Sequence, residues 1–181
     1  MIHFNRKITL KEFALRVGNI LKQASIDAVL TGGAVVSIYT DNKYQSFDLD
    51  FITHSSLKDL EKAFKGTGFY HEGRYFKHPE TEFFIDFPAP PLSVGNAPVT
   101  EFREIVSKNH YLKLLTPTHC VMDRLAAHYH WNDQQALVQA LMVAWENAID
   151  LKKIKEWSYE EGMKKKYEYF LSEYKKMKSK R

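Results

Sequence analysis

Two aspartates near the first third of the chain have a spacing suited to metal chemistry. Asp48 and Asp50 are two residues apart in the segment 46–53, Ser-Phe-Asp-Leu-Asp-Phe-Ile-Thr. The apolar residues around them predict a buried or half-buried strand, on which residues i and i+2 point to the same face. Because burying unpaired charge is costly, two carboxylates on one face of a core strand indicate a cationic partner. Mg²⁺ binds carboxylates together with substrate phosphates, so the pair predicts a site for metal-assisted phosphoryl or nucleotidyl transfer.

A glycine pair precedes the two acids. Gly32 and Gly33 follow the apolar segment 26–30, which predicts a strand, and lead into 34–39, which predicts a short helix. At a strand–Gly-Gly–helix turn the backbone can come close to a phosphate, and the N–H groups at the helix start attract anions. We therefore expect Gly32 and Gly33 to bind phosphate groups, although a plain strand-to-helix turn would use the same residues.

A third acid lies in a later apolar segment. Residues 82–88 read Glu-Phe-Phe-Ile-Asp-Phe-Pro, with Asp86 as the central acid. If this strand pairs beside 47–52, Asp86 joins Asp48 and Asp50. Three such acids can hold two metal ions roughly 3.5–4 Å apart, clamping the attacking and leaving oxygens of an in-line displacement. The alternative is that Asp86 caps the turn before the proline-rich segment 88–91.

Two polar residues lie just before the acidic strand. Ser46 precedes Asp48 by two positions, so it shares the same face and could contact a phosphate or a metal-bound water. Lys43 lies in the preceding loop and could contact a triphosphate, or it could be an ordinary surface charge.

The order of these features resembles the nucleotidyltransferase superfamily, whose small members share a DNA-polymerase-beta-like palm. Residues 26–52 carry the specific part of the resemblance, and Asp86 fits the third acid of that superfamily. Downstream, 115–119 (Leu-Thr-Pro-Thr-His), 123–127 (Asp-Arg-Leu-Ala-Ala) and 131–135 (Trp-Asn-Asp-Gln-Gln) are similar to the helical part of small bacterial nucleotidyltransferases related to abortive-infection type toxins. The resemblance covers roughly residues 20–150.

The resemblance implies an α+β fold: a nucleotidyltransferase-like mixed sheet flanked by helices, with an all-helical C-terminal half. It implies Mg²⁺-dependent transfer of a nucleoside monophosphate from a nucleoside triphosphate to a hydroxyl group, with two ions at the site and release of pyrophosphate. The acceptor would be a protein, a tRNA or other RNA end, or a small molecule, and an antitoxin-like protein would be a partner. Asp133 would border the nucleotide pocket; alternatively, it caps the second helix of the C-terminal half.

Two positions depart from the superfamily pattern. Gly33 stands where relatives often have a serine. Many relatives carry a lysine early in the helix that follows Thr-Pro-Thr, where this chain has Asp123 and Arg124. A triphosphate-binding lysine is therefore not carried over to this chain.

The surrounding pattern predicts the elements that position these residues. Thr9 and Glu12 form a capping-box pattern at the start of the first helix. The expected helices are 9–24, 33–40, 56–65, 117–130, 133–148, 150–157 and 159–178. The expected strands are 26–31, 46–53, 68–77, 82–87 and 100–115, with a loop at 88–98. We place a palm-like domain at 1–115 and a helical region packed on it at 116–181.

Composition indicates an ordinary cytoplasmic protein. The chain has 181 residues, 44% of them hydrophobic, and no apolar run of the length of about 18 residues that a membrane span needs. Its N-terminus lacks the apolar core of a signal peptide. Cys120 is the only cysteine, so no intrachain disulfide can form, and its apolar surroundings indicate a packing role.

Positive charge gathers at the C-terminus. Residues 152–181 contain eleven Lys or Arg and five Glu. This segment could bind RNA, since clustered lysines neutralise phosphates. The interpretation that we favour is a solvated helix with one apolar packing stripe: Met163, Tyr167, Phe170, Tyr174 and Met177. Two alternatives to an enzyme therefore stay open: an RNA-binding protein, and a catalytically silent module that binds nucleotide or a partner.

Overall fold

The computed structural model describes residues 4–107 and 110–179. Its helices are α1 (Leu10–Gln23), α2 (Gly32–Tyr39), α3 (Leu57–Phe64), α4 (Pro117–Trp131), α5 (Gln134–Glu146), α6 (Leu151–Glu160) and α7 (Lys164–Lys178). Its strands are β1 (Ala28–Thr31), β2 (Asp48–Thr53), β3 (Tyr70–Glu72), β4 (Tyr75–Lys77), β5 (Phe84–Asp86), β6 (Ser93–Val94), β7 (Ala97–Pro98), β8 (Phe102–Ser107) and β9 (His110–Leu115).

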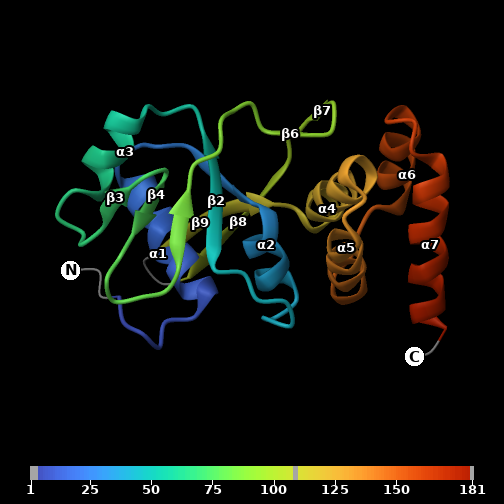
Figure 1. Cartoon of the computed structure of the whole chain (residues 1–181), viewed down its shortest axis with the longest axis horizontal. Coiled ribbons are helices and arrows are strands. Elements are labelled where there is room, and N and C mark those ends of the chain that lie inside the picture. Colours follow the sequence, from blue (N-terminus) through green and yellow to red (C-terminus); the bar gives the residue numbers. More distant parts are fainter. Residues whose placement is uncertain (1–3, 108–109, 180–181) are drawn as a thin grey trace.

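Seven of the strands form one mixed sheet in the order β3-β4-β5-β2-β1-β9-β8. β2 pairs antiparallel with β1 and parallel with β5, and β1 pairs parallel with β9. The sheet occupies the left half of Figure 1, helices α4 to α7 occupy the right half, and α2 lies between them. The expected α+β architecture with a helical C-terminal half is confirmed.

Side-chain caps mark several helix starts, and the capping box at Thr9 and Glu12 was predicted. Thr9 and Glu12 form the capping box of α1, and Ser56 caps α3 through a second box. Thr116 caps α4, in which Pro117 occupies the first turn. These local hydrogen bonds satisfy backbone N–H groups that a helix start leaves free. The positions of the helix starts can therefore be predicted from the sequence.

Three segments differ from the sequence expectations. The expected strand at 68–77 is a hairpin, β3 and β4, whose two-residue turn places Gly73 at a φ of +65°. The expected strand at 100–115 is the hairpin β8–β9. The expected loop at 88–98 contains the small hairpin β6–β7. Each difference lies at a short-range reversal, where turn geometry rather than apolar periodicity decides the path.

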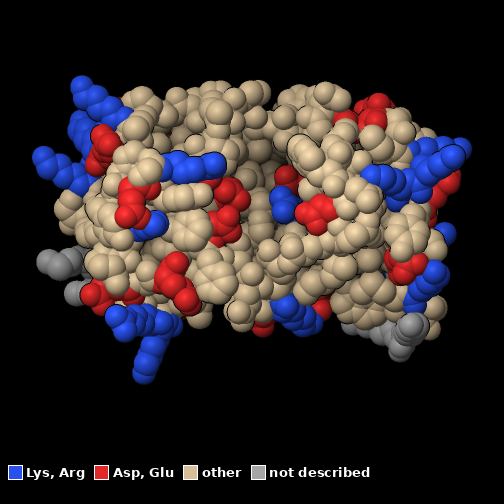
Figure 2. Space-filling view, in the orientation of Figure 1, with Lys and Arg blue, Asp and Glu red and all other residues tan. Residues whose placement is uncertain are grey.

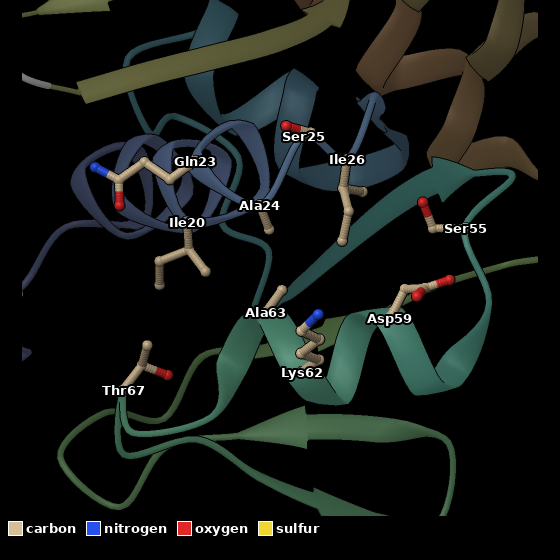
Figure 3. A pocket seen from close by; sticks show the side chains of 10 residues that line it. All are labelled: Ile20, Gln23, Ala24, Ser25, Ile26, Ser55, Asp59, Lys62, Ala63 and Thr67. Carbon is tan, nitrogen blue, oxygen red and sulfur yellow. The ribbon is translucent and has the colours of Figure 1, made fainter.

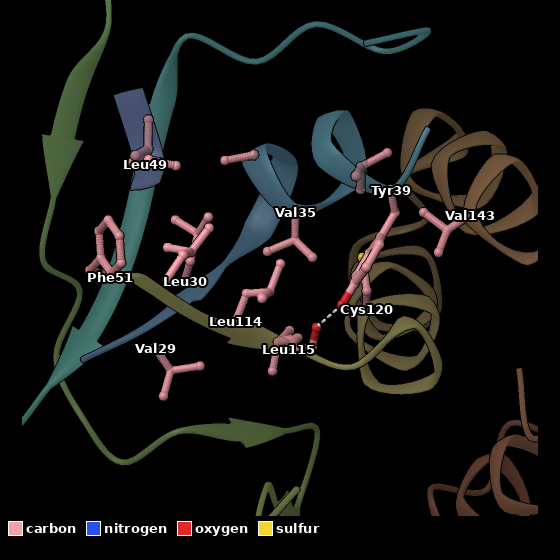
Figure 4. Packing of buried hydrophobic residues seen from close by; sticks show 14 of the residues in the cluster. Val29, Leu30, Val35, Tyr39, Leu49, Phe51, Leu114, Leu115, Cys120 and Val143 are labelled. Atoms are coloured by element: carbon pink, nitrogen blue, oxygen red, sulfur yellow. Dashed lines mark hydrogen bonds between the residues drawn. The ribbon is translucent and has the colours of Figure 1, made fainter. Parts of the chain in front are cut away.

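One continuous core joins the sheet to the helices. Leu30, Leu49 and Leu114 of the sheet and Cys120 of α4 are fully buried in the same apolar cluster (Figure 4). The Tyr39 hydroxyl at the end of α2 donates a hydrogen bond of 2.7 Å to the Leu115 carbonyl, where the strands give way to helices. The packing role expected for Cys120 is confirmed, and burial raises the pKa of its thiol.

The C-terminal helix α7 packs through its aromatic side chains. Tyr167, Phe170 and Tyr174 are buried, whereas Met163 and Met177 at the ends of the stripe are half-buried. The packing stripe that we favoured is confirmed. No helix in the described part of the chain combines the length and apolar character needed to cross a membrane.

Candidate active site

Three carboxylates lie side by side on one face of the sheet. Burial alternates along β2, so that Leu49 and Phe51 point into the core while Asp48 and Asp50 are half-buried on the other face. The parallel register of β2 and β5 sets Asp50 directly beside Asp86, and paired residues of neighbouring strands share a face. The structure therefore brings together the three acids that the sequence singled out.

The pKa of Asp50 is shifted by its surroundings. Burial, followed by the charges of Asp48 and Asp86, raises the pKa of Asp50 from 3.8 to about 6. Arg124 of α4 opposes this rise, and Asp123 adds to it. A carboxylate that loses water and faces two like charges favours its neutral form, and a bound cation would relieve both effects.

The glycine turn lies against Asp50. Gly32 adopts a φ of +70°, and a β-carbon added there would overlap the Asp50 Oδ2 atom. The Thr31 hydroxyl donates to the Asp50 backbone carbonyl at 3.1 Å and does not cap α2. The N-terminus of α2 is thus held beside the acids without a side-chain cap of its own.

Ser46 contacts the first acid. Its hydroxyl donates a hydrogen bond of 2.6 Å to Asp48 Oδ1, and its backbone N–H donates to the Ser37 hydroxyl at 3.0 Å. The same hydroxyl oxygen lies 3.0 Å from the place that a β-carbon on Gly33 would occupy. The absence of a side chain at Gly33 therefore leaves room for the Ser46 hydroxyl against the carboxylate.

Asp86 already has a cationic partner. Arg74, in the turn between β3 and β4, donates from Nε to Asp86 Oδ1 at 3.1 Å and from Nη2 to Oδ2. Sequence reasoning missed this arginine. The signal was available in principle: the β4–β5 pairing puts Tyr75 opposite Asp86, so the residue before Tyr75 lies near the acid. The contact depends on the exact register of the β4–β5 hairpin and on the turn at Gly73, which apolar patterns do not give.

A second charged pair faces the acids from the helical half. Arg124 donates to Asp123 Oδ2 from Nε at 2.9 Å and from Nη2 at 2.6 Å, while its Nη1 reaches Gln139 Oε1 at 3.4 Å. Figure 2 shows a hollow between the two halves of the molecule, with acidic side chains on the sheet side and side chains of both charges on the helical side. The charge of Arg124 favours the ionised form of Asp50.

Two predicted site residues have other partners. Lys43 forms an ion pair with Glu146 near the end of α5. Asp133 caps α5 by accepting a hydrogen bond of 3.0 Å from the Ala136 N–H, which confirms the alternative role that the sequence suggested for it. Neither contact involves the three acids, so a nucleotide-binding role for these two residues stays a prediction.

The acids fit a hard divalent cation only in part. Asp48 and Asp50 offer oxygen ligands on one face, and burial, followed by the charges of Asp48 and Asp86, raises the pKa of Asp50. Both oxygens of Asp86, by contrast, accept hydrogen bonds from Arg74. Within the described ranges, no three His, Cys, Asp or Glu side chains are arranged to hold a metal ion. The residues therefore fit one Mg²⁺ at Asp48 and Asp50, and a second ion would require Asp86 to exchange its partner.

A groove lies away from these acids. It measures about 670 Å³ and lies between the end of α1 and the helix α3 (Figure 3). Its one acidic side chain, Asp59, is engaged in capping α3. We assign the chemistry to the acid face rather than to this groove, because three carboxylates converge on the acid face, whereas the groove has one acid, which caps a helix.

Comparison with known proteins identifies the fold. No family model matches the sequence, and no curated protein does. The structure is similar to the crystal structure of an antigenic nucleotidyltransferase-like protein from Paracoccidioides brasiliensis, with a TM-score of 0.53 and 13% sequence identity over 76% of this chain and 77% of that one. The chain therefore has a nucleotidyltransferase-like fold, as the sequence resemblance predicted.

Proposed function

We propose that the protein is a Mg²⁺-dependent nucleotidyltransferase that moves a nucleoside monophosphate from a nucleoside triphosphate to a hydroxyl acceptor. The observation that carries this proposal is the pairing of Asp50 with Asp86 beside Gly32, on a nucleotidyltransferase-like fold. Acids on adjacent strands next to an uncapped helix start match what a metal–triphosphate complex needs: oxygen ligands for the cation and N–H donors for the phosphates.

Each residue has a distinct task in the proposed reaction. Asp48 and Asp50 would hold Mg²⁺, which stabilises the charge that develops on the phosphates. Gly32, Gly33 and the start of α2 would bind the β- and γ-phosphates. The half-buried guanidinium of Arg124, whose charge acts on Asp50, would attract the triphosphate.

Asp86 would help to deprotonate the acceptor hydroxyl. The acceptor oxygen then forms a bond to the α-phosphorus, while the bond from that phosphorus to the bridging oxygen breaks and pyrophosphate leaves with the bonding electrons. The proton of the hydroxyl passes to the carboxylate. Asp86 needs a free oxygen for this task, so its contact with Arg74 must loosen during the reaction.

The acceptor class is open within this proposal. A protein side chain, a tRNA or other RNA end, and a small molecule such as an aminoglycoside all offer a suitable hydroxyl. A toxin-type role in a bacterial cytoplasm, with an antitoxin-like partner, is part of the same proposal and rests on the sequence resemblance alone.

Incubation of the purified protein with each labelled triphosphate, Mg²⁺ and a cell extract tests the proposal. We expect one triphosphate to label an acceptor and release pyrophosphate in equal amount. Labelling that persists at the same level with EDTA would contradict a metal-dependent reaction.

A catalytically silent nucleotide-binding module is the second candidate. The contact of Arg74 with both Asp86 oxygens favours it, because an acid that is permanently paired can neither bind a metal nor accept a proton. Isothermal titration with the four triphosphates and Mg²⁺ separates the two candidates: binding followed by pyrophosphate release supports the enzyme, and binding without release supports the silent module.

A further inference from the structure

The two side chains of the Arg74–Asp86 ion pair differ strongly in their exposure to solvent. The Arg74 side chain is 64% exposed, whereas that of Asp86 is 9% exposed. Arg74 belongs to the two-residue turn of the β3–β4 hairpin, and β3 is the edge strand of the sheet. The guanidinium can therefore withdraw into solvent by side-chain rotation, while the carboxylate stays in its strand.

Arg74 also occupies hydrogen-bond acceptor positions on both carboxylate oxygens of Asp86. Asp86 Oδ1 accepts from Arg74 Nε and from the Phe87 N–H at 2.9 Å, which occupies both of its lone pairs. Oδ2 accepts from Arg74 Nη2. A divalent cation brought to the remaining lone pair of Oδ2 would stand close to a guanidinium charge that the same oxygen already binds.

We propose that Arg74 is a built-in counter-ion that competes with a second divalent cation for Asp86. This inference rests on the proposed function, since it concerns the metal site of the same reaction. With Arg74 on Asp86, only Asp48 and Asp50 are available to a cation. When Arg74 leaves, the third carboxylate becomes available and the acids can hold two ions.

The counter-ion has a clear electrostatic reason. Three neighbouring carboxylates repel one another when no cation is present, and the strand pairing holds Asp50 directly beside Asp86. Arg74 neutralises the most buried of the three in the metal-free protein. The paired state therefore stabilises the fold between turnovers and keeps the full acid cluster from forming until a cation competes for it.

Binding of Mn²⁺ to the full chain, followed by electron paramagnetic resonance, tests the competition without any turnover. We compare the wild type, Arg74→Gln and the double variant Arg74→Gln with Asp86→Asn. Removal of the competing charge should raise the affinity of the weaker ion at least about tenfold, or add one bound ion per chain. The added Asp86→Asn should abolish that gain, because the carboxylate that binds the ion is gone.

Lys77→Ala is the matched control. Lys77 lies on the same hairpin and pairs with Glu72 rather than with Asp86, so its loss removes one positive charge nearby without freeing the acid. Its Mn²⁺ affinity should stay within about twofold of the wild type. A gain as large as that of Arg74→Gln would show a general charge effect and overturn the proposal.

Thermal melting covers the case in which Arg74→Gln weakens the fold. An unpaired Asp86 should lower the melting temperature without metal, and Mn²⁺ should raise it more in Arg74→Gln than in the wild type. Equal Mn²⁺ affinity of the wild type and Arg74→Gln overturns the counter-ion proposal and leaves the proposed function standing. Absence of Mn²⁺ binding to all the proteins at millimolar concentration overturns both.

Discussion

At the scale of single residues, the charged form of Asp50 lowers the stability of the fold. Its pKa of about 6 lies above the ordinary 3.8, so folding favours its neutral form. The stability that the neutral form contributes is fully present below about pH 4 and is lost as the pH rises through 6. Asp48, Asp86 and Asp123 disfavour the charged form, and Arg124 favours it.

Asp50→Asn should therefore stabilise the metal-free protein at neutral pH. We expect the free energy of unfolding to rise by about 2 kcal/mol at pH 7.5 and not to rise at pH 4, since the carboxyl group is already neutral there. Urea denaturation with EDTA at the two pH values measures this difference. As a control, Asp27→Asn removes a largely exposed carboxylate that precedes β1 and pairs with Lys113, and it should change stability by less than about 1 kcal/mol at either pH. A destabilised Asp50→Asn at pH 7.5 would contradict the assignment.

The glycine turn gives a second prediction at this scale. Gly32→Ala suffers both an unfavourable positive φ and an overlap with Asp50, whereas Gly66→Ala has nearly the same φ, +76°, and nothing within 4 Å. Gly66→Ala should cost about 1 kcal/mol of stability, and Gly32→Ala clearly more. Thermal melting of both variants gives the difference, which measures the contact with the carboxylate. Equal costs would mean that Gly32 is not pressed against Asp50.

The residue types of the site were predictable because their pattern is local. A period of two along one strand puts Asp48 and Asp50 on one face, whatever the rest of the fold does. The pairing of Asp86 with Asp50 needed the assumption that 82–87 lies beside 47–52. Arg74 was not predicted, because its position depends on both a turn and a strand register.

At the scale of secondary structure elements, the helices were easier to predict than the strands. Capping residues such as Thr9 and Thr116 mark helix starts through hydrogen bonds within four residues. In the segment 68–77 the turn is marked only by Gly73, and the structure folds the segment into a hairpin. A short strand depends on hydrogen bonds with the strands beside it, and the sequence does not show which segments pair.

The C-terminal helix α7 offers a matched pair of neighbouring aromatic residues. Phe170 is fully buried, and Tyr169 is 52% exposed. Phe170→Ala should lower the free energy of unfolding by about 3–5 kcal/mol because it leaves a cavity, whereas Tyr169→Ala should change it by less than about 0.5 kcal/mol. Chemical denaturation of the two variants checks this. If both changes were equally mild, α7 would not pack on the molecule.

At the scale of the whole molecule, the strands and the helical half share one core. Buried residues run without a break from the sheet through α2 into α4 and α5. The proposed boundary between 115 and 116 thus separates the strands from the C-terminal helices. The hydrophobic core continues across this boundary. The acids and Arg124 face one another over the same junction, so the proposed chemistry depends on this packing.

A continuous core predicts cooperative unfolding of both halves. All three tryptophans lie between 131 and 157, so their fluorescence reports the helical half. Hydrogen exchange of the β2 amides reports the sheet. We expect both probes to give the same free energy of unfolding within about 1 kcal/mol. Two well-separated transitions would show that the halves fold independently.

The most direct test of the central claim is pyrophosphate release from a labelled triphosphate in the presence of Mg²⁺ and the cell extract, measured for the wild type, Asp48→Asn and the exposed-site control Asp27→Asn. The account predicts Mg²⁺-dependent release by the wild type and by Asp27→Asn. It predicts release at the background level by Asp48→Asn, whose circular dichroism stays unchanged. Release by Asp48→Asn at the wild-type rate would contradict the role of the paired carboxylates in nucleotidyl transfer.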